Sequence, residues 1–312
     1  MIGIDVGGAN LKLVDGNRVT LQYCPLWEDA PLTDLLQAFR GAHPDPDAAV
    51  VMSGELADCF GTKIEGIRFI VESVQEAYPD AIFYGIDGAF HREPVFQLAA
   101  ANWLASADYL RVRYPRAVLL DIGSTTTDII PLPSFSRLLG LTDLGRLQRG
   151  YLLYTGLLRT SLSTQILSVK VKGADTPTCA EYFAIAADAH LVLGHITPRV
   201  YTCDPPDRGK KNVGAALRRL ARLVCADLDE IGPDEALGIA RQFWEAQRDR
   251  IRAAADRVVE DSGADSIVVA GIGSSLFARE LGGRDLAREL GAVSDALPAY
   301  AVKEVAVREP GS

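Results

Sequence analysis

The strongest constraint in this sequence is an internal repeat. Residues 1–14, MIGIDVGGANLKLV, align without a gap with residues 117–130, AVLLDIGSTTTDII, at an offset of 116. The alignment places Asp5 on Asp121, so that an acidic residue follows a short apolar run in each copy. A gapless repeat at so long a separation predicts that the two halves of the chain begin with the same structural unit.

Each copy predicts a β-hairpin, because an apolar strand ending in aspartate is followed by a glycine-containing turn and a second strand-like run. Glycine permits positive φ and lets a ligand oxygen approach backbone amides. A single hairpin of this kind is also an ordinary turn, so the prediction of a binding site depends on having two in register. The predicted phosphate-binding residues are those of the two turns, Gly7, Gly8 and Asn10 in the first copy and Gly123, Ser124, Thr125 and Thr126 in the second.

Carboxylates at the ends of the two first strands suit Mg²⁺, which takes oxygen ligands and bridges phosphate oxygens. We therefore expect Asp5 and Asp121 to be catalytic metal ligands, with Asp128 in the outer shell of the metal. Lys12 aligns with Asp128 and is expected to neutralise a phosphate as a point charge. The alternative for Lys12 and Asp128 is a pair of solvent-facing hairpin charges.

Two lobes are predicted, the first over residues 1–115 and the second over residues 116–312, with the last segment of the second available to pack back on the first. No low-complexity linker separates them, so the lobes should be closely packed and hinged. Strand patterns outside the repeat occur at 19–23, 48–52, 81–84 and 266–270. Helical periodicity occurs at 32–40, 63–77, 95–107, 179–193, 213–229 and 233–262.

Three further loops carry polar residues. The strand at 266–270 runs into Gly271, Gly273 and Ser274, which predicts either a nucleotide-side phosphate contact or an ordinary strand-to-helix turn. A second loop after a buried strand, with Ser53, Gly54, Glu55 and Asp58, lies where α/β sheets carry binding residues. The basic cluster at 207–211 is expected to be a solvated loop, with contact to an anionic substrate as the alternative.

Composition excludes several classes of protein. The 41 acidic residues outnumber the 32 basic residues, and no basic stripe interleaves with aromatic residues, which argues against a nucleic-acid partner. The five cysteines are scattered without a Cys-x-x-Cys pair, which argues against a disulfide framework or zinc knuckle and favours a reducing cytoplasm. No apolar run reaches the length of about 18 residues that a membrane span requires, and the N-terminus lacks a signal-peptide pattern.

Other catalytic signatures are missing from the sequence pattern. His190 and His195 are five positions apart, which does not place both on one helix face, so we expect structural roles for them. No Ser-His-Asp or Cys-His spacing indicates nucleophilic hydrolysis. The sequence leaves open whether the chain forms a homo-oligomer.

Three motifs resemble those of the actin-like superfamily, which includes sugar kinases, heat-shock ATPases and the hydantoinase/oxoprolinase group. DVGGANLK is similar to the first phosphate motif, DIGSTTTD to the second and VVAGIGSS to the adenosine-side glycine motif. The resemblance extends over the whole chain and implies an α/β, two-lobed, actin-like fold, a duplicated ribonuclease H-like unit with a central cleft. The segments VVMSGELAD, LLDIGSTTTDIIPL and DAHLVLGHI further resemble tetrahydromethanopterin-linked one-carbon-pathway proteins similar to the condensing synthase of methanofuran and methylofuran biosynthesis.

This narrower resemblance implies an alkyl transfer. An aminomethyl-furan-methyl diphosphate loses diphosphate, and the phenol oxygen of tyramine or glutamyl-tyramine attacks the freed carbon to form an aryl ether. Ala9 and Asn10 stand where kinases usually carry hydroxyl residues. The glycine pattern at Gly271 and Gly273 is weak as a signature of adenosine binding. Both departures favour Mg²⁺ with a diphosphate substrate over ATP. The alternatives are an ATP-dependent small-molecule kinase or oxoprolinase-type enzyme, and a non-catalytic nucleotide-sensing protein.

Overall fold

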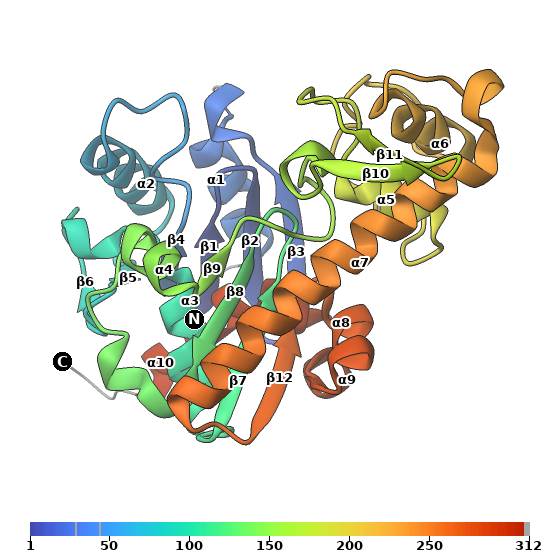
Figure 1. Ribbon diagram of the computed structural model, residues 1–312. Helices are drawn as coiled ribbons and strands as arrows, with labels where there is room; N and C mark the ends of the chain where they lie inside the picture. The colour runs from blue at the N-terminus through green and yellow to red at the C-terminus, as the bar shows by residue number, and fades with distance from the viewer. Residues whose placement is uncertain (29, 44, 309–312) are drawn as a thin grey trace.

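The computed structural model describes residues 1–28, 30–43 and 45–308 and contains two mixed β-sheets (Figure 1). The first sheet has the order β3-β2-β1-β4-β5-β6, and its strands are β1 (Ile2–Val6), β2 (Asn10–Asp15), β3 (Arg18–Tyr23), β4 (Ala48–Met52), β5 (Ile82–Tyr84) and β6 (Phe90–His91). The second has the order β13-β12-β7-β8-β9, with β7 (Ala117–Ile122), β8 (Thr127–Pro131), β9 (Leu152–Leu153), β12 (Ser266–Ala270) and β13 (Arg284–Asp285). A separate hairpin pairs β10 (Ser168–Val171) with β11 (Ala174–Pro177).

The two sheets repeat one topology. In the first, β1, β2 and β3 form an antiparallel meander, and β4 and β5 add in parallel on the other side of β1. In the second, β7, β8 and β9 form the meander, and β12 and β13 add in parallel beside β7. The duplicated α/β, two-lobed actin-like fold expected from the sequence is confirmed by this strand order.

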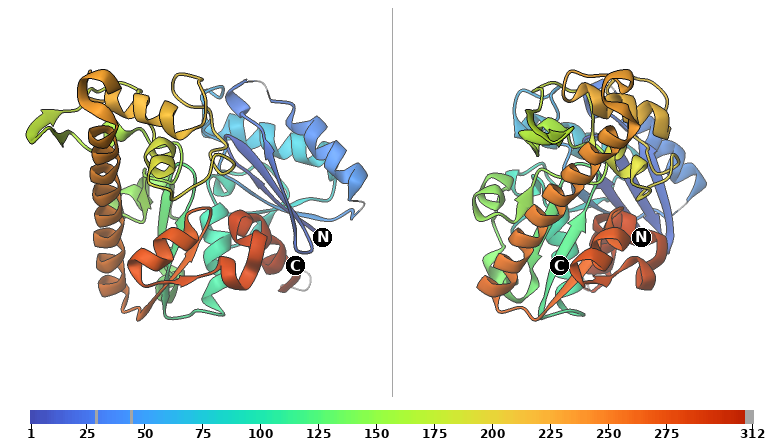
Figure 2. Two further views of the ribbon diagram at one scale, coloured as in Figure 1. Left: turned by 90° about the vertical axis from the view of Figure 1, so that its right-hand side faces the viewer. Right: turned by 45° about the vertical axis from the view of Figure 1, so that its right-hand side comes forward.

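Helices cover both sheets and fill the space between them. Their bounds are α1 (Leu32–Ala42), α2 (Lys63–Ala77), α3 (Asn102–Arg111), α4 (Asp143–Arg149), α5 (Ala186–Val192), α6 (Val213–Arg222), α7 (Leu228–Ser262), α8 (Ser274–Leu281), α9 (Ala287–Leu290) and α10 (Leu297–Arg308). Short 3₁₀ turns occur at η1 (Leu26–Glu28), η2 (Phe96–Leu98), η3 (Leu132–Arg137), η4 (Leu162–Thr164) and η5 (Gly291–Ala296). The C-terminal helix α10, drawn in dark red, lies between the two sheets, where its apolar residues pack against both inner faces (Figure 2).

Strand alternation explains which face each helix covers, because successive side chains of a strand point to opposite faces. Ile4 of β1 packs with α1 and α2 on the outer face of the first sheet, whereas Val51 of β4 lies on the inner face. In the second sheet Leu120 points outward toward α7, and Leu119 points inward. The two inner faces share one apolar cluster with α3 and α10, so the lobes are joined by a common core.

The C-terminal helix α10 lies directly on the first sheet and contacts β1, β4 and α3. A Cβ built on Gly3 would fall 1.9 Å from the carbonyl oxygen of Ala299, so only glycine allows this approach. The Lys303 ammonium group also donates to the carbonyl of Gly16 at 2.9 Å. The end of the chain therefore packs against its beginning.

Three predicted helices are shorter than their periodicity indicates. The pattern at 213–229 yields only α6, which ends at Arg222, and Cys225 takes a positive φ of 54° before α7 begins at Leu228. The pattern at 95–107 is interrupted after η2 because Ala100 takes a positive φ of 48°, and α3 begins only at Asn102. The pattern at 179–193 yields only α5, which starts at Ala186 after an irregular segment. In all three regions apolar residues pack in the core without helical backbone, so the spacing of apolar residues alone predicts a longer helix than the one that forms.

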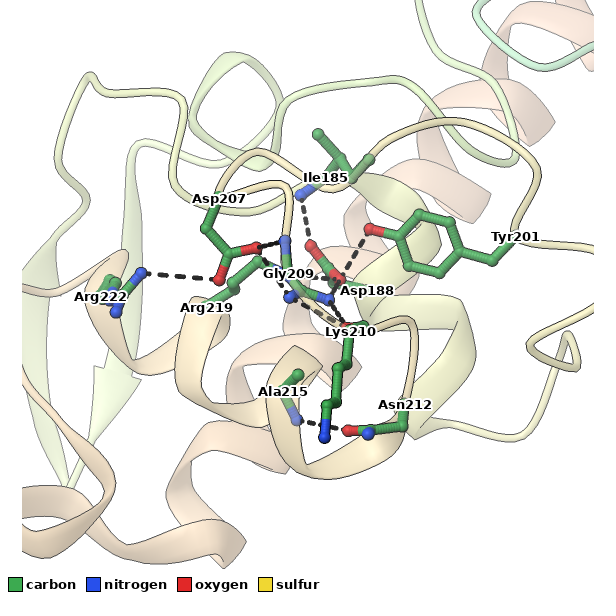
Figure 3. A network of polar contacts seen from close by, with 10 residues as sticks. All are labelled: Ile185, Asp188, Tyr201, Asp207, Gly209, Lys210, Asn212, Ala215, Arg219 and Arg222. Carbon is green, nitrogen blue, oxygen red and sulfur yellow. Dashed lines mark hydrogen bonds and ion pairs between the residues drawn. The ribbon is translucent and has the colours of Figure 1, made fainter.

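A buried ion pair anchors the basic loop at 207–211 (Figure 3). Arg219 donates from Nη2 to Asp188 at 2.7 Å, and both side chains are fully buried. Tyr201 donates its hydroxyl proton to the same carboxylate at 2.9 Å, and Asp207 accepts from Arg219 at 3.1 Å. The loop is thus held through Asp207 while Lys210 stays exposed, as expected of a solvated loop.

Cysteine and membrane expectations can also be compared with the structure. All five cysteines are free thiols, although the sulfur atoms of Cys179 and Cys225 lie 3.0 Å apart. Among the described residues, no helix combines the length and apolar character needed to cross a membrane.

Candidate active site

The two repeated turns have the same backbone geometry. In the first, the amide of Gly7 donates to the carbonyl of Asn10 at 3.0 Å, and in the second, Gly123 donates to Thr126 at 2.9 Å. These four residues are aligned in the repeat, so its register is preserved at the level of individual hydrogen bonds. The sequence alignment therefore identifies structurally equivalent positions.

The paired strands place the predicted charged residues on matching sites. Asp5 lies opposite Lys12 across β1 and β2, and Asp121 lies opposite Asp128 across β7 and β8. Directly paired residues share a face of the sheet. Asp5 also pairs with Val51, which lies on the inner face, and Asp121 lies two residues after the inward-facing Leu119. All four charged side chains therefore face the region between the lobes.

Each turn is held from behind by a following loop. The amide of Leu26 donates to the carbonyl of Gly8 at 2.9 Å, and the amide of Leu158 donates to the carbonyl of Ser124 at 3.0 Å. In a trans peptide the carbonyl and the next N–H point in opposite directions. The amides of Ala9 and Thr125 are therefore directed away from these loops, where they can donate to a ligand.

The hydroxyl residues of the second turn are also available for binding. Ser124, Thr125 and Thr126 are partly buried, and their hydroxyl groups make no hydrogen bond to any residue that the structure describes. The first turn offers Asn10, which is exposed, and two glycines. Together the turns supply amide and hydroxyl donors from both lobes, an arrangement suited to phosphorus oxyanions.

Five charged residues form a group that we call the acid–lysine cluster, namely Asp5, Lys12, Asp121, Asp128 and Asp295. Lys12 Nζ lies 3.2 Å from Asp5 Oδ2. Burial opposes the charge on Lys12, but the carboxylates of Asp5 and Asp121 outweigh it and raise the pKa of the amine. The charged residues of the two hairpins are therefore close enough for their charges to interact across the lobes.

Asp121 has a strongly perturbed carboxyl group. Burial, with the charge of Asp128 nearby, raises the pKa of Asp121 to about 7 despite the attraction of Lys12. Burial likewise raises the pKa of Asp295, which lies in η5. These groups carry an unfavourable charge in the absence of a cation, so the site favours binding of positive charge.

Asp128 differs from Asp5 and Asp121 because it has an arginine partner. Arg146 of α4 is buried, forms ion pairs with Asp128 and Asp143, and stacks over the ring of Trp103 with its guanidinium carbon 4.4 Å from the ring centroid. Desolvation nevertheless raises the pKa of Asp128 above its ordinary value. Asp128 is therefore held by protein contacts, which the sequence did not indicate.

The cluster can accommodate Mg²⁺ with two carboxylates. Asp5 Oδ1 is buried and has no hydrogen-bond partner among the described residues, a costly state that a cation or its water would relieve. Within those same residues, no three His, Cys, Asp or Glu side chains form a ready-made metal site. Asp5 and Asp121 with substrate oxygens and water fit the preference of Mg²⁺ for few protein ligands.

The predicted glycine motif after β12 packs against the second aspartate. Gly271 has a φ of 80°, and a Cβ there would lie 2.4 Å from Asp121 Oδ1. A Cβ on Gly273 would lie 2.4 Å from the Ile122 side chain, and Ser274 begins α8 as a buried residue. In the first lobe Gly54 is the counterpart, with its built Cβ 3.0 Å from the carbonyl oxygen of Gly7. Both glycines let the neighbouring strand end approach closely.

Sequence reasoning missed several residues that surround the two turns. Asp295 and Arg146 come from distant segments, and no local pattern marks them. Arg159 follows the second turn's supporting loop, and its guanidinium carbon lies 5.3 Å from the ring centroid of Trp27 in the first lobe. Glu55, which the sequence did indicate, is buried with Oε2 unpaired among the described residues, and burial raises its pKa.

Comparison with known proteins identifies the family. The model of the hydantoinase/oxoprolinase family matches residues 47–305. This chain belongs to the hydantoinase/oxoprolinase family. A relative, the (4-{4-[2-(gamma-L-glutamylamino)ethyl]phenoxymethyl}furan-2-yl)methanamine synthase of Methanocaldococcus jannaschii, is 34% identical over 289 residues, which cover 88% of this chain and 87% of the relative.

A second relative with the same name, from Methanococcus vannielii, is 39% identical over 159 residues, covering 51% of this chain and 72% of the relative. Among solved structures, a ROK family glucokinase from Streptomyces griseus in complex with glucose and AMPPNP has a TM-score of 0.47 and 12% identity over 99% of both chains. A nucleotide-free acetone carboxylase has a TM-score of 0.48 and 12% identity, covering 94% of this chain and 51% of that one.

Proposed function

We propose that this chain is an alkyltransferase of methanofuran or methylofuran biosynthesis. It would join an aminomethyl-furan-methyl diphosphate to the phenol oxygen of tyramine or glutamyl-tyramine, releasing diphosphate. The proposal rests above all on the acid–lysine cluster between two equivalent donor turns. It is supported by 34% identity to a synthase whose name contains a phenoxymethyl-furan group.

The proposed reaction breaks one carbon–oxygen bond and forms another. The bond from the furan methylene to diphosphate breaks, and its electron pair leaves with diphosphate. The furan ring donates electron density to the methylene, which stabilises positive charge there while the phenol oxygen attacks. The phenol proton passes to solvent water as the aryl ether forms. The main task of the protein is therefore to stabilise the negative charge that develops on the departing diphosphate.

Residues of both lobes have defined parts in this reaction. The amides of Ala9 and Thr125, which face away from their supporting loops, would donate to diphosphate oxygens. Lys12 would supply a positive charge from the first lobe, where its pKa is raised and it stays protonated. The hydroxyl groups of the second turn would complete the donors. These contacts tighten as charge moves onto the leaving group, so they lower the barrier rather than only binding substrate.

Asp5 and Asp121 would hold Mg²⁺, with Asp128 in its outer shell. When bound, the ion supplies neutralising charge to the diphosphate oxygens. The unpaired oxygen of Asp5 and the raised pKa of Asp121 both support a cation at this position. Arg146 would fix the orientation of Asp128 through their ion pair.

Product analysis tests the proposal directly. The purified protein is incubated with the synthetic furan diphosphate, a phenolic acceptor and Mg²⁺, without ATP, and both diphosphate and the aryl ether are measured. Diphosphate release that requires both substrates and stops on adding EDTA supports the proposal. ADP formation with ATP and an acceptor, without ether from the furan diphosphate, would instead favour a kinase or oxoprolinase-type enzyme.

The matched variants are Asp121→Asn at the site and Asp265→Asn at the surface. Asp265 is more than half exposed and pairs with Arg116, far from the turns along the second sheet. Loss of turnover in the first variant with wild-type turnover in the second assigns the activity to the acid–lysine cluster. Equal activity in both variants would remove Asp121 from the site.

A further inference from the structure

A hollow lies beside the second turn. Its volume is about 360 Å³, and it is lined by Thr125, Tyr154, Arg159, Thr160, Ser161 and Arg250, among others. This volume is in the range of small-molecule sites. The lining comes from the turn itself, from the loop that supports it and from the exposed side of α7. The hollow therefore adjoins the proposed diphosphate site without including Asp5 or Asp121.

The hollow is positively charged in a protein of net charge -9. It contains two arginines and several hydroxyl groups, and no Asp or Glu lines it. Within the described residues, neither Arg159 nor Arg250 forms an ion pair, and Arg250 donates only to the amide oxygen of Gln165 at 3.0 Å. Arginine binds carboxylates through two parallel hydrogen bonds. Unpaired guanidinium groups in a common hollow therefore indicate a site for an anion.

The arginines of the hollow and the amide donors for diphosphate belong to different parts of the second turn and its supporting loop. Arg159 and Thr160 belong to the loop that holds the second turn from behind, where the amides of Leu158 and Arg159 donate to the carbonyl of Ser124. The amide of Thr125 points away from that loop. The amide donor for diphosphate thus points away from the loop that carries Arg159, and Thr125 borders both the diphosphate site and the hollow.

Exposed aromatic side chains lie near Arg159. Its guanidinium carbon is 5.3 Å from the Trp27 ring centroid, and its charge is close enough to influence the pKa of Tyr23. Tyr154, which is 61% exposed, lines the hollow itself. An aromatic ligand with an anionic tail matches this combination of rings and guanidinium groups.

We propose that the hollow binds a carboxylate on the tail of the phenolic acceptor, with Arg159 and Arg250 as the binding residues. This inference rests on the proposed alkyl transfer and assigns the residues that recognise the tail of the acceptor. The enzyme would prefer a phenol whose amine carries an amino-acid tail, such as γ-glutamyl-tyramine, over tyramine, which has no carboxylate.

The test compares kcat/KM for γ-glutamyl-tyramine and tyramine at saturating furan diphosphate and Mg²⁺. We expect the wild-type protein to prefer γ-glutamyl-tyramine, and Arg159→Gln to reduce this preference by about 10- to 100-fold, as expected for charge-assisted hydrogen bonds. Arg250→Gln should reduce it less, because Arg250 is exposed. The control is Arg248→Gln, on the same helix, whose arginine pairs with Asp249 and does not line the hollow.

Equal kcat/KM values for the two acceptors in the wild-type protein would overturn the proposal. So would a rise in KM for the furan diphosphate in Arg159→Gln with unchanged acceptor preference, which would assign the arginine to diphosphate. If no phenol yields an ether, the proposed function fails. Calorimetric titration with γ-glutamyl-tyramine then still tests whether the hollow binds the acceptor tail. Binding that Arg159→Gln weakens supports the site, and absence of binding overturns it.

Discussion

Replacing Asp121 with asparagine should make the free protein more stable and nearly inactive. The substitution keeps the size of the side chain but removes its charge. Burial raises the pKa of Asp121 from 3.8 to about 7, and this shift already includes the opposing attraction of Lys12. In the absence of divalent metal, the ionised carboxylate is therefore a net cost to the folded state.

The pH window follows from the direction of this shift. Between pH 3.8 and about 7 the folded state binds more protons than the unfolded state, so stability falls as pH rises through that window. A shift of roughly 3 units at about 1.36 kcal/mol per unit gives an upper limit of about 4 kcal/mol. Relaxation and solvent near this partly exposed group reduce the expected cost to about 2–4 kcal/mol. Asparagine avoids that cost.

The assay is thermal unfolding with EDTA from pH 4.5 to 8.5. At about 2 °C per kcal/mol for a chain of this size, Asp121→Asn should unfold roughly 4–8 °C above wild type at pH 8. The gain should shrink toward zero near pH 4.5, and Asp265→Asn should show none. Turnover should fall about 100-fold or more. A lower midpoint than wild type at pH 8, or a gain independent of pH, would refute this electrostatic account.

Three further predictions concern packing, ion pairing and binding. Gly271→Ala should lower the free energy of unfolding by about 2–4 kcal/mol, because the added Cβ would overlap neighbouring atoms. Gly140→Ala, where φ is 77° and the surroundings are open, should lower it by only about 1 kcal/mol. Equal midpoints of urea unfolding for the two variants would contradict this prediction. Asp188→Asn should lower the free energy of unfolding by about 3–5 kcal/mol, because it leaves the buried Arg219 without its charged partner. The control Arg222→Gln, at an exposed position, should lower it by less than about 0.5 kcal/mol in the same urea assay. Lys12→Gln should weaken binding of Mg²⁺–diphosphate about tenfold by calorimetry, and unchanged affinity would exclude Lys12 from the site.

The repeat predicted the parts of the site that depend on local backbone structure. Gly7 and Gly123 donate to residues three positions later, so the turn is encoded within a few residues of sequence. The strands at 48–52 and 266–270 were also predicted with their observed bounds, because buried strands of β-branched and small residues have a clear local pattern. Local hydrogen bonds and strand patterns can therefore be inferred without coordinates.

Contacts between distant segments could not be predicted in this way. Arg146 reaches Asp128 because α4 packs beside the second sheet, and Asp295 joins the cluster through η5 near the end of the chain. The spacing of His190 and His195 predicted separate positions, yet their Nδ1 atoms lie 3.0 Å apart. The helix α5 ends at Val192 and the chain turns back, so linear spacing no longer measures distance.

The position of α10 bears on how the protein folds during synthesis. Its packing surface on β1 and β4 forms when the first lobe is made, but the helix that covers it is synthesised only after the whole second lobe. At about 5–20 residues per second, this apolar face stays uncovered for roughly 10–50 s. During that interval the nascent chain can bind chaperones or aggregate through this face. A product truncated before Leu297 lacks α10, so its apolar face stays uncovered permanently.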